Sequence, residues 1–351
     1  MPLLTYQQVR PWAKAIKAAL LAGKMPPWQA DPQYGKFVND LRLGPGEKET
    51  LVAWIDGGAL EGNPADAPKA RAYVDGWQIP KPDVVFEMPQ DFNVPATGAI
   101  NYQYISVPTH FTEDKWVEAM EVRPGNRASV HHAIVVIDSA DGERGQEYLA
   151  GYAPGMAPQL WKPGQARLIK AGATLVFQMH YQATGKPVKD RTRIGLIFAK
   201  KPAAEQIVAM QSAAHWLAIP PGEANYRVTA TETIREPAML VGMRAHMHLR
   251  GKSFTFRARY PGGEVETLLD IPNFDFNWQP YYYLAKPKPL PVGTRIEAVA
   301  VFDNSPNNLV NPNPKTTVFW GPQTWDEMMI GWFDIAVPVR PAPRSVSTTG
   351  F

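Results

Sequence analysis

The stretch SVHHAIVVID (129–138) is rich in valine and isoleucine, which favour the extended backbone of a β-strand. Similar short runs occur along the chain, separated by turn residues and without helical periodicity between them. The first set comprises residues 100–107, 116–124, 129–138, 173–182 and 192–200, and the second comprises residues 238–249, 253–260, 264–271, 294–304 and 327–337. Strands at this spacing predict an all-β fold of two tandem antiparallel β-sandwiches.

Residues 1–65 have a different pattern. Helices are expected over 6–24, ended by Gly23 and the MPPW break, and over 45–60, ended near Gly57-Gly58. A proline-rich connector (64–98) follows. The predicted organisation is a helical segment at 1–65, a first sandwich at 66–202 and a second at 203–351.

The composition narrows the class of protein. The 351 residues include 35 prolines and no cysteine, and 45% of them are hydrophobic. A net charge of +3 without a basic run argues against a nucleic-acid partner, and no apolar stretch is long enough to predict a membrane span. Arg10, Lys14 and Lys17 interrupt the N-terminal apolar segment, so it does not read as a signal peptide. The absence of cysteine excludes disulfides and thiolate ligands.

Five of the seven histidines form two groups: His131, His132 and His180 in the first predicted sandwich, and His246 and His248 in the second. In His246-x-His248, strand alternation would place both rings on one face, where they could chelate one ion. Adjacent His131 and His132 would point to opposite faces, so joint ligation requires a bulge. An isolated pair of this kind is more often one core and one surface histidine.

Imidazole ligands suit zinc, copper, iron and nickel alike, whereas a thioether selects copper, especially Cu(I). The chain has twelve methionines, most of which should fill cores. Spacing alone does not distinguish Met328 from the other methionines as a metal ligand. His110 and His215 are assigned no role.

At these residues the chain resembles the copper type II, ascorbate-dependent monooxygenases, the family of the peptidylglycine- and dopamine-hydroxylating enzymes. The resemblance covers about residues 100–337. It is carried, in the family's order, by four motifs: VHHAIV, LVFQMHY, AHMHLRGK and the DEM segment at 326–328.

The resemblance implies jelly-roll-like sandwiches with one copper in each. His131, His132 and His180 would hold an electron-transfer copper, and His246, His248 and Met328 the copper that binds O₂. With ascorbate or another one-electron donor, the enzyme would hydroxylate a C–H bond of a small organic substrate, and electrons would cross a solvent-filled cleft.

The resemblance also suggests a substrate pocket. Arg244 matches the arginine that binds a substrate carboxylate in the peptide-hydroxylating branch. Ile330 and Trp332 replace the Asn and Tyr that assist it, which favours a flatter, more apolar pocket over peptide recognition.

The segment from Leu4 to Trp28, with the second helix, resembles the back half of a class I cytochrome c domain, a module that precedes such copper domains in bacterial proteins. Met25 would match the axial haem ligand only if a segment upstream of this chain supplied the haem. No C-x-x-C-H motif is present, so no covalent haem is expected. A small helical cap packed on the sandwiches is an equal alternative.

The leading hypothesis is therefore a two-copper monooxygenase that acts on a small molecule. It would be periplasmic or secreted through a targeting segment not contained in this chain, and an electron-donor protein is a possible partner. Two alternatives stay open: a zinc-dependent hydrolase built on the HxH pair, and a non-catalytic copper-binding or electron-transfer protein.

Overall fold

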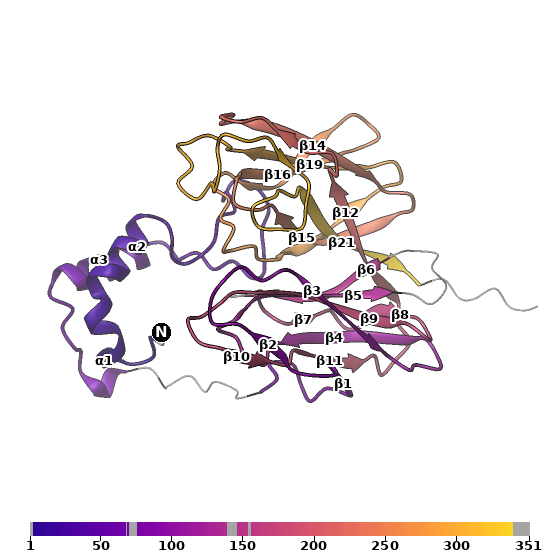
Figure 1. Ribbon diagram of the computed structural model, residues 1–351, viewed down its shortest axis with the longest axis horizontal. Helices are drawn as coiled ribbons and strands as arrows, with labels where there is room; N and C mark the ends of the chain where they lie inside the picture. Colours follow the sequence, from indigo (N-terminus) through magenta and orange to yellow (C-terminus); the bar gives the residue numbers. More distant parts are fainter. Residues whose placement is uncertain (1–2, 68, 70–75, 139–145, 154–155, 340–351) are drawn as a thin grey trace, which may run out of the picture.

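The computed structural model describes residues 3–67, 69, 76–138, 146–153 and 156–339. Figure 1 shows two β-structured bodies, one above the other, and a small helical lobe beside them. The fold class is all-β, with two antiparallel, jelly-roll-like sandwiches and a helical N-terminal segment, as predicted.

One large sheet runs through both sandwiches. Its strands, in spatial order, are β1 (Val84–Glu87), β11 (Arg193–Phe198), β4 (Lys115–Arg123), β8 (Gln165–Ile169), β12 (Glu205–Ala213), β21 (Ile330–Pro338), β15 (Ala238–His246) and β18 (Tyr282–Leu290), with β7 (Gln159–Leu160) attached to β4. The sandwiches meet where β8 and β12 pair in parallel, Glu205 opposite Gln165 and Gln206 opposite Ala166. The two sandwiches therefore share one sheet, a connection that the sequence pattern did not predict. The predicted boundary at 202/203 falls between β11 and β12.

A four-stranded sheet completes each sandwich. The first contains β3 (Gln103–Pro108), β9 (Thr174–Tyr181), β5 (Val130–Asp138) and β6 (Gln146–Tyr152), and the second contains β14 (Tyr226–Thr233), β19 (Arg295–Phe302), β16 (Gly251–Arg259) and β17 (Val265–Ile271). Two short pairs lie outside these sheets: β2 (Phe92–Val94) with β10 (Val188–Asp190), and β13 (Ala218–Ile219) with β20 (Val318–Phe319).

Each sandwich has its own apolar core. In β5, Ala133, Val135 and Ile137 are buried in the first core, and in β15, Met243 and Ala245 are buried in the second. Because side chains alternate along a strand, the residues between them point away from the cores. Each strand therefore keeps one face for packing and leaves the other free to line a site.

All ten predicted runs contain a strand with similar bounds. Sequence reasoning missed several others, including β6, β12 and β18. The connector at 64–98 is also not a plain linker, because it supplies the edge strand β1 and the short β2.

The helical lobe contains α1 (Tyr6–Val9), α2 (Ala13–Leu21) and α3 (Glu47–Asp56), within the predicted helical ranges, and short 3-10 turns at Arg10–Trp12 and Pro64–Asp66. Ala13, Ile55 and Ala59 form a small core of its own. The chain between α2 and α3 packs on the second sandwich, where Trp28 and Phe37 join its core.

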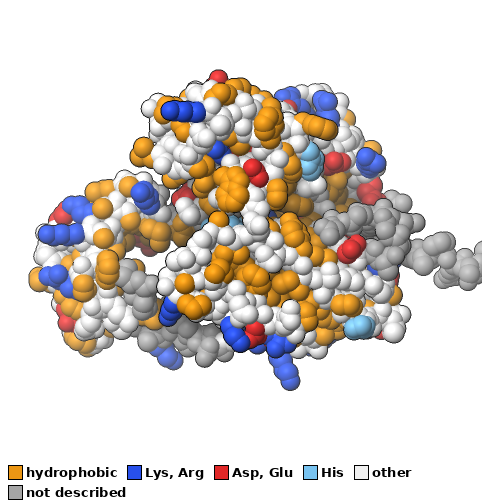
Figure 2. All heavy atoms as spheres, viewed as in Figure 1, with side chains coloured by type: hydrophobic (Ala, Val, Ile, Leu, Met, Phe, Trp, Pro, Cys, Tyr) orange, Lys and Arg blue, Asp and Glu red, His pale blue; other side chains and the backbone are white. Residues whose placement is uncertain are grey.

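The face of the molecule drawn in Figure 2 carries charges of both signs. On the face drawn in Figure 2, the basic and acidic side chains of the described residues are interspersed and form no continuous patch of one sign. Among the helices of the described ranges, none is long and apolar enough to cross a membrane.

Candidate metal centre

The first histidine cluster forms across the β5–β9 pair. His132 lies directly opposite His180, and the pairing register shifts between Val130 and His132. This irregularity is the bulge that two adjacent ligands require, because it turns the His131 ring to the side occupied by His132. The ring centroids lie 5.5 Å (131–132), 5.1 Å (131–180) and 4.9 Å (132–180) apart.

The nitrogen atoms of this cluster suit a metal ion. One ligand atom from each of the three rings can be chosen such that all lie within 4.8 Å of one another. The Nδ1 atoms of His131 and His132 are 3.2 Å apart, and the Tyr102 hydroxyl lies 3.3 Å from His132 Nε2 on the opposite side of that ring. His180 Nδ1 is buried without a hydrogen-bond partner. Buried polar atoms are rarely left unsatisfied, so an ion bound here would remove a cost.

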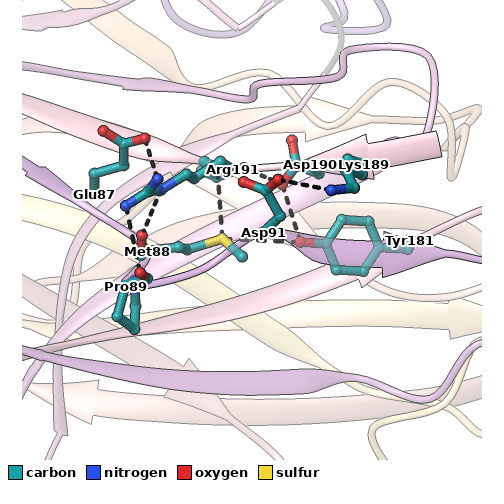
Figure 3. A network of polar contacts seen from close by, with 9 residues as sticks. Glu87, Met88, Pro89, Asp91, Tyr181, Lys189, Asp190 and Arg191 are labelled. Carbon is teal, nitrogen blue, oxygen red and sulfur yellow. Dashed lines mark hydrogen bonds and ion pairs between the residues drawn. The ribbon is translucent and has the colours of Figure 1, made fainter.

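Asp190 anchors the chain on both sides of this cluster. Its Oδ2 accepts a hydrogen bond from the Tyr181 hydroxyl (3.0 Å), and its Oδ1 accepts one from the backbone N–H of Asn126 (2.8 Å), in the turn before β5. Figure 3 shows Tyr181 and Asp190 side by side, next to the Arg191–Glu87 ion pair. One buried carboxylate thus ties the end of β9, next to His180, to the start of β5.

The second histidine cluster is not positioned by strand alternation, although this was expected. β15 ends at His246, and His248 lies beyond it in a turn, so strand alternation does not bring the two rings together. The buried carboxylate of Glu327 fixes the turn by accepting backbone hydrogen bonds from His248 (2.8 Å) and Arg250 (2.6 Å). The two histidine rings lie 5.2 Å apart.

Two carbonyl oxygens set the orientation of these rings. His246 Nδ1 lies 2.7 Å from Gln279 Oε1, and His248 Nδ1 lies 3.2 Å from the backbone oxygen of Asp326. Because a carbonyl oxygen can only accept, each Nδ1 carries the hydrogen and each Nε2 keeps a free lone pair. Gln279 also donates to the Phe276 backbone oxygen (2.8 Å), which fixes the direction of its amide. Hydrogen bonds of this kind orient histidine ligands in metal sites.

Met328 and the predicted substrate residues line the same pocket as these rings. The pocket has a volume of about 200 Å³ and is walled by Tyr102, His132, Ile134, Val136, Tyr148, Gln178, Arg244, His246, His248, Pro322, Met328, Ile330 and Trp332. All three substrate candidates, Arg244, Ile330 and Trp332, therefore face one space. Arg244 is only 6% exposed, its Nε has no hydrogen-bond partner, and none of the described carboxylates forms an ion pair with it.

Both clusters contribute residues to the lining of this space. His132 lines the pocket together with His246 and His248. The Phe276 ring stacks on His131 (5.3 Å between centroids, 17° between planes) and meets His248 edge-on (6.1 Å, 85°). A single aromatic ring thus contacts one histidine of each cluster, and the solvent-filled cleft expected between the clusters stays a prediction.

Burial keeps the histidines neutral. Together with smaller contributions from the neighbouring His131 and His248, it lowers the pKa of His180 to about 4. Burial likewise lowers the pKa of His246 to about 3 and that of His248 to about 4. The same cause lowers the pKa of His131 and holds that of His132 well below its ordinary value. Neutral imidazole is the form that binds metals, so all five rings are ready to act as ligands at neutral pH.

The remaining candidates lie elsewhere. His215 packs beside Trp320, and His110 occupies a turn with φ 55°. Met25 is 47% exposed on the helical lobe.

Sequence reasoning missed Gln279, Phe276 and Glu327. Glu327 stands next to Met328 within the DEM segment, and that position was its only signal. Gln279 and Phe276 come from an irregular loop whose sequence shows no pattern of its own.

Comparison with known proteins adds no assignment. No family model matches the chain, and no curated protein matches it. Among solved structures, it is similar to the major capsid protein P2 from bacteriophage PM2 (8% identity, TM-score 0.30, 72% of this chain and 99% of that one) and to PBCV-1 VP54 (8%, 0.26, 75% and 96%). An allantoicase is also similar (9%, 0.19, 61% and 81%). Overlaps this loose carry no argument about function.

Proposed function

We propose that this protein is a two-copper monooxygenase that hydroxylates a C–H bond of a small organic molecule with O₂ and an external one-electron donor. The observation that carries the proposal is the closeness of two unlike donor sets to one pocket: a cluster of three imidazoles that reaches the pocket through His132, and two imidazoles with a thioether that line it. A thioether favours copper, especially Cu(I), over zinc.

His131, His132 and His180 would hold one copper, and His246, His248 and Met328 the other. Bound copper supplies one-electron redox chemistry and a place for O₂ to bind. The protein contributes the orientation of the rings: Tyr102 lies at His132 Nε2, and Gln279 and the Asp326 carbonyl hold Nδ1 of His246 and His248. The donor set with the thioether would face the substrate, since Arg244 and Trp332 line the pocket beside it.

The pocket also indicates the substrate class. Ile134, Val136 and Trp332 offer an apolar wall, and its volume of about 200 Å³ suits a small molecule. A buried guanidinium without a carboxylate partner favours an anionic group on the ligand. The proposed substrate is therefore a small, mainly apolar molecule with one anionic group near Arg244.

Metal analysis and electron paramagnetic resonance of the copper-loaded chain test the proposal. We expect about two copper ions per chain with different spectra, together with ascorbate-dependent O₂ consumption. Met328→Leu removes the thioether and keeps the volume, and should abolish hydroxylation while the three-histidine site keeps its copper. Met210→Leu, at the second core and away from the pocket, is the matched control. Preferential zinc retention with O₂-independent hydrolysis would instead favour the hydrolase, and copper binding without O₂ consumption would favour the electron carrier.

A further inference from the structure

Unsatisfied buried polar atoms concentrate beside the pocket. In the part of the chain that the structure describes, nine buried side-chain atoms lack a hydrogen-bond partner in bonding geometry, and six of them belong to five neighbouring residues. These six are Tyr148 Oη, both amide atoms of Gln159, Arg167 Nε, Arg244 Nε and Asp334 Oδ2. We call these five residues the polar seam.

Side-chain contacts join most of the seam. The Arg244 guanidinium lies 5.4 Å from the centroid of the Tyr148 ring. Arg167 donates to the Tyr148 backbone oxygen and forms a buried ion pair with Asp334 (2.8 Å). The phenols of Tyr281 and Tyr283 interact with Asp334 and with the Gln159 amide, respectively. The seam therefore crosses the junction between the two sandwiches, from β6, β7 and β8 to β15 and β21.

The seam has a space at each end. Tyr148 and Arg244 line the metal pocket. Gln159 lines a second space of about 330 Å³, which we call the outer cavity, together with Glu121, Arg127, Gly151, Tyr152 and Met156 among others.

Tyr148 is the partition between these two spaces. A Cβ placed on Gly151, in the wall of the outer cavity, would lie only 3.0 Å from Tyr148 Oη. The Tyr148 ring contacts Trp332 of the metal pocket, with centroids 5.4 Å apart. Met156 of the outer cavity also approaches Arg244, at 4.0 Å between Sδ and Nη1. The hydroxyl of Tyr148 thus lies between Gly151, in the wall of the outer cavity, and Arg244, while Tyr148 itself lines the metal pocket.

Hydroxylation of a C–H bond consumes protons, and the polar seam offers a route by which they could reach the metal pocket. The balanced reaction is R–H + O₂ + 2 e⁻ + 2 H⁺ → R–OH + H₂O, with the electrons supplied by the external reductant. Two protons must therefore enter the pocket in each turnover. The described lining residues include neutral histidines and Arg244, and a guanidinium does not release its proton. Buried polar atoms without protein partners are ordinarily satisfied by ordered water.

We propose that the Tyr148 hydroxyl and ordered water along the polar seam carry protons from the outer cavity to the metal pocket. This inference rests on the proposed function. In each transfer, Tyr148 Oη gives its proton toward an oxygen acceptor in the pocket and takes one from water on the Gly151 side. The phenol ends unchanged, and no electron moves along the seam.

Ascorbate-driven O₂ consumption by the copper-loaded full chain, measured in H₂O and in D₂O, tests the relay without knowledge of the substrate. Reduction of O₂ to H₂O₂ also consumes two protons, so the same supply is needed. Tyr148→Phe should lower the rate at least about tenfold, as expected for loss of a proton-transfer group, and change the solvent isotope effect. Copper content and the KM for ascorbate should stay the same. Gln159→Leu should act in the same direction and more weakly.

Tyr226→Phe, on β14 and away from the pocket, is the matched control and should leave both rate and isotope effect unchanged. If Tyr148→Phe behaves like Tyr226→Phe, the relay is wrong.

A high-resolution crystal structure separates the relay from the proposed function. Ordered water bonded to Tyr148 Oη, the Gln159 amide and Asp334 Oδ2 supports the relay. A dry seam in a protein that consumes O₂ overturns the relay alone. A wet seam in a copper-loaded protein that consumes no O₂ overturns the proposed function, and the relay with it.

Discussion

His131, His132 and His180 take their positions from sheet pairing, whereas His246 and His248 take theirs from side-chain hydrogen bonds at the end of a strand. In the first cluster, a bulge and a direct cross-strand pair place the three rings. In the second, Glu327 holds the backbone of the turn and Gln279 holds a ring. The first cluster should therefore be rigid before any ion binds, and the second should depend on a few separate contacts. Under the proposed function, such a difference would suit one site that only passes electrons and another that must admit O₂ and substrate.

Loss of a ligand should have the largest effect and test whether the two sites are independent. His132→Ala removes the ring that lies opposite His180, and the copper content should fall from about two per chain to about one. His215→Ala, at an exposed ring outside both clusters, should keep both ions. Loss of both ions from His132→Ala would show that the clusters form one coupled site and not two independent ones.

Glu327→Ala should destabilise the protein and disable the second cluster alone. The substitution leaves the N–H groups of His248 and Arg250 buried without an acceptor, which should cost about 3 kcal/mol of unfolding free energy. Denaturant unfolding measures the loss, and copper titration should show that only the first site remains. Glu327→Gln keeps one acceptor oxygen, so its free energy of unfolding should lie between those of the unmodified protein and of Glu327→Ala. An unchanged midpoint for Glu327→Ala would contradict this role.

Acid should destabilise the metal-free protein through both clusters. The folded-state pKa values, about 4 for His180 and His248 and about 3 for His246, lie below the ordinary 6.5. These histidines therefore bind more protons in the unfolded chain than in the folded one over this range. Their contribution to stability is complete above pH 6.5 and is lost as the pH drops toward 4. Each such proton adds about 1.4 kcal/mol per pH unit to the loss.

Glu327 opposes this trend. Burial raises its pKa to about 8, so its contribution is present at low pH and is lost as the pH rises from 4.5 to 8. Unfolding midpoints at pH 7.5, 6 and 5 measure the sum of these opposing contributions to stability. Between pH 7.5 and 5, the stability lost through the three histidines should exceed the stability gained through Glu327. A midpoint that does not fall with acid would show that the rings are solvated.

Gln279→Leu should weaken the second site without destroying it. It removes the acceptor of His246 Nδ1 and frees the ring to rotate, which should lower copper affinity there about 10–100-fold. Competition with a copper chelator measures the change. Gln182→Leu, at an exposed position after β9, serves as the control. An equal effect on both sites would indicate that Gln279 acts through the whole loop.

Tyr181→Phe should have the smallest effect. It removes the hydrogen bond to Asp190 and the longer contact with Met88 Sδ at the end of β9, so about 1 kcal/mol of unfolding free energy should be lost. The copper spectrum of the first site should not change, because the sheet register still pairs His132 with His180. A clear spectral change would show that this cluster also depends on side-chain contacts.

The sequence predicts what depends on local pattern. The Val/Ile runs around residues 130–138 and 174–181 specify strands, and the adjacent histidines require the bulge that the structure contains. β18 was missed because its two prolines, at 287 and 289, read as loop. The parallel pairing of β8 with β12 was also missed, since it joins two short segments whose sequences show no mutual signal.

The second cluster was harder to predict for the same reason. Alternation was expected to place His248, but a turn fixed by Glu327 places it. Gln279 reaches His246 from a loop, a contact set by tertiary packing alone. The helical lobe was predicted from its periodicity, whereas the proposed role of Met25 stays a prediction.

The parallel β8–β12 pair also governs how the chain can be divided. A cut at the predicted boundary, 202/203, would separate these strands and expose their unpaired backbone groups as bare sheet edges. Each half would then offer a template for intermolecular pairing, so isolated halves should aggregate instead of behaving as exchangeable modules. The two sandwiches should unfold as a single cooperative unit. A destabilising substitution in either sandwich should therefore lower the melting temperature of the whole protein.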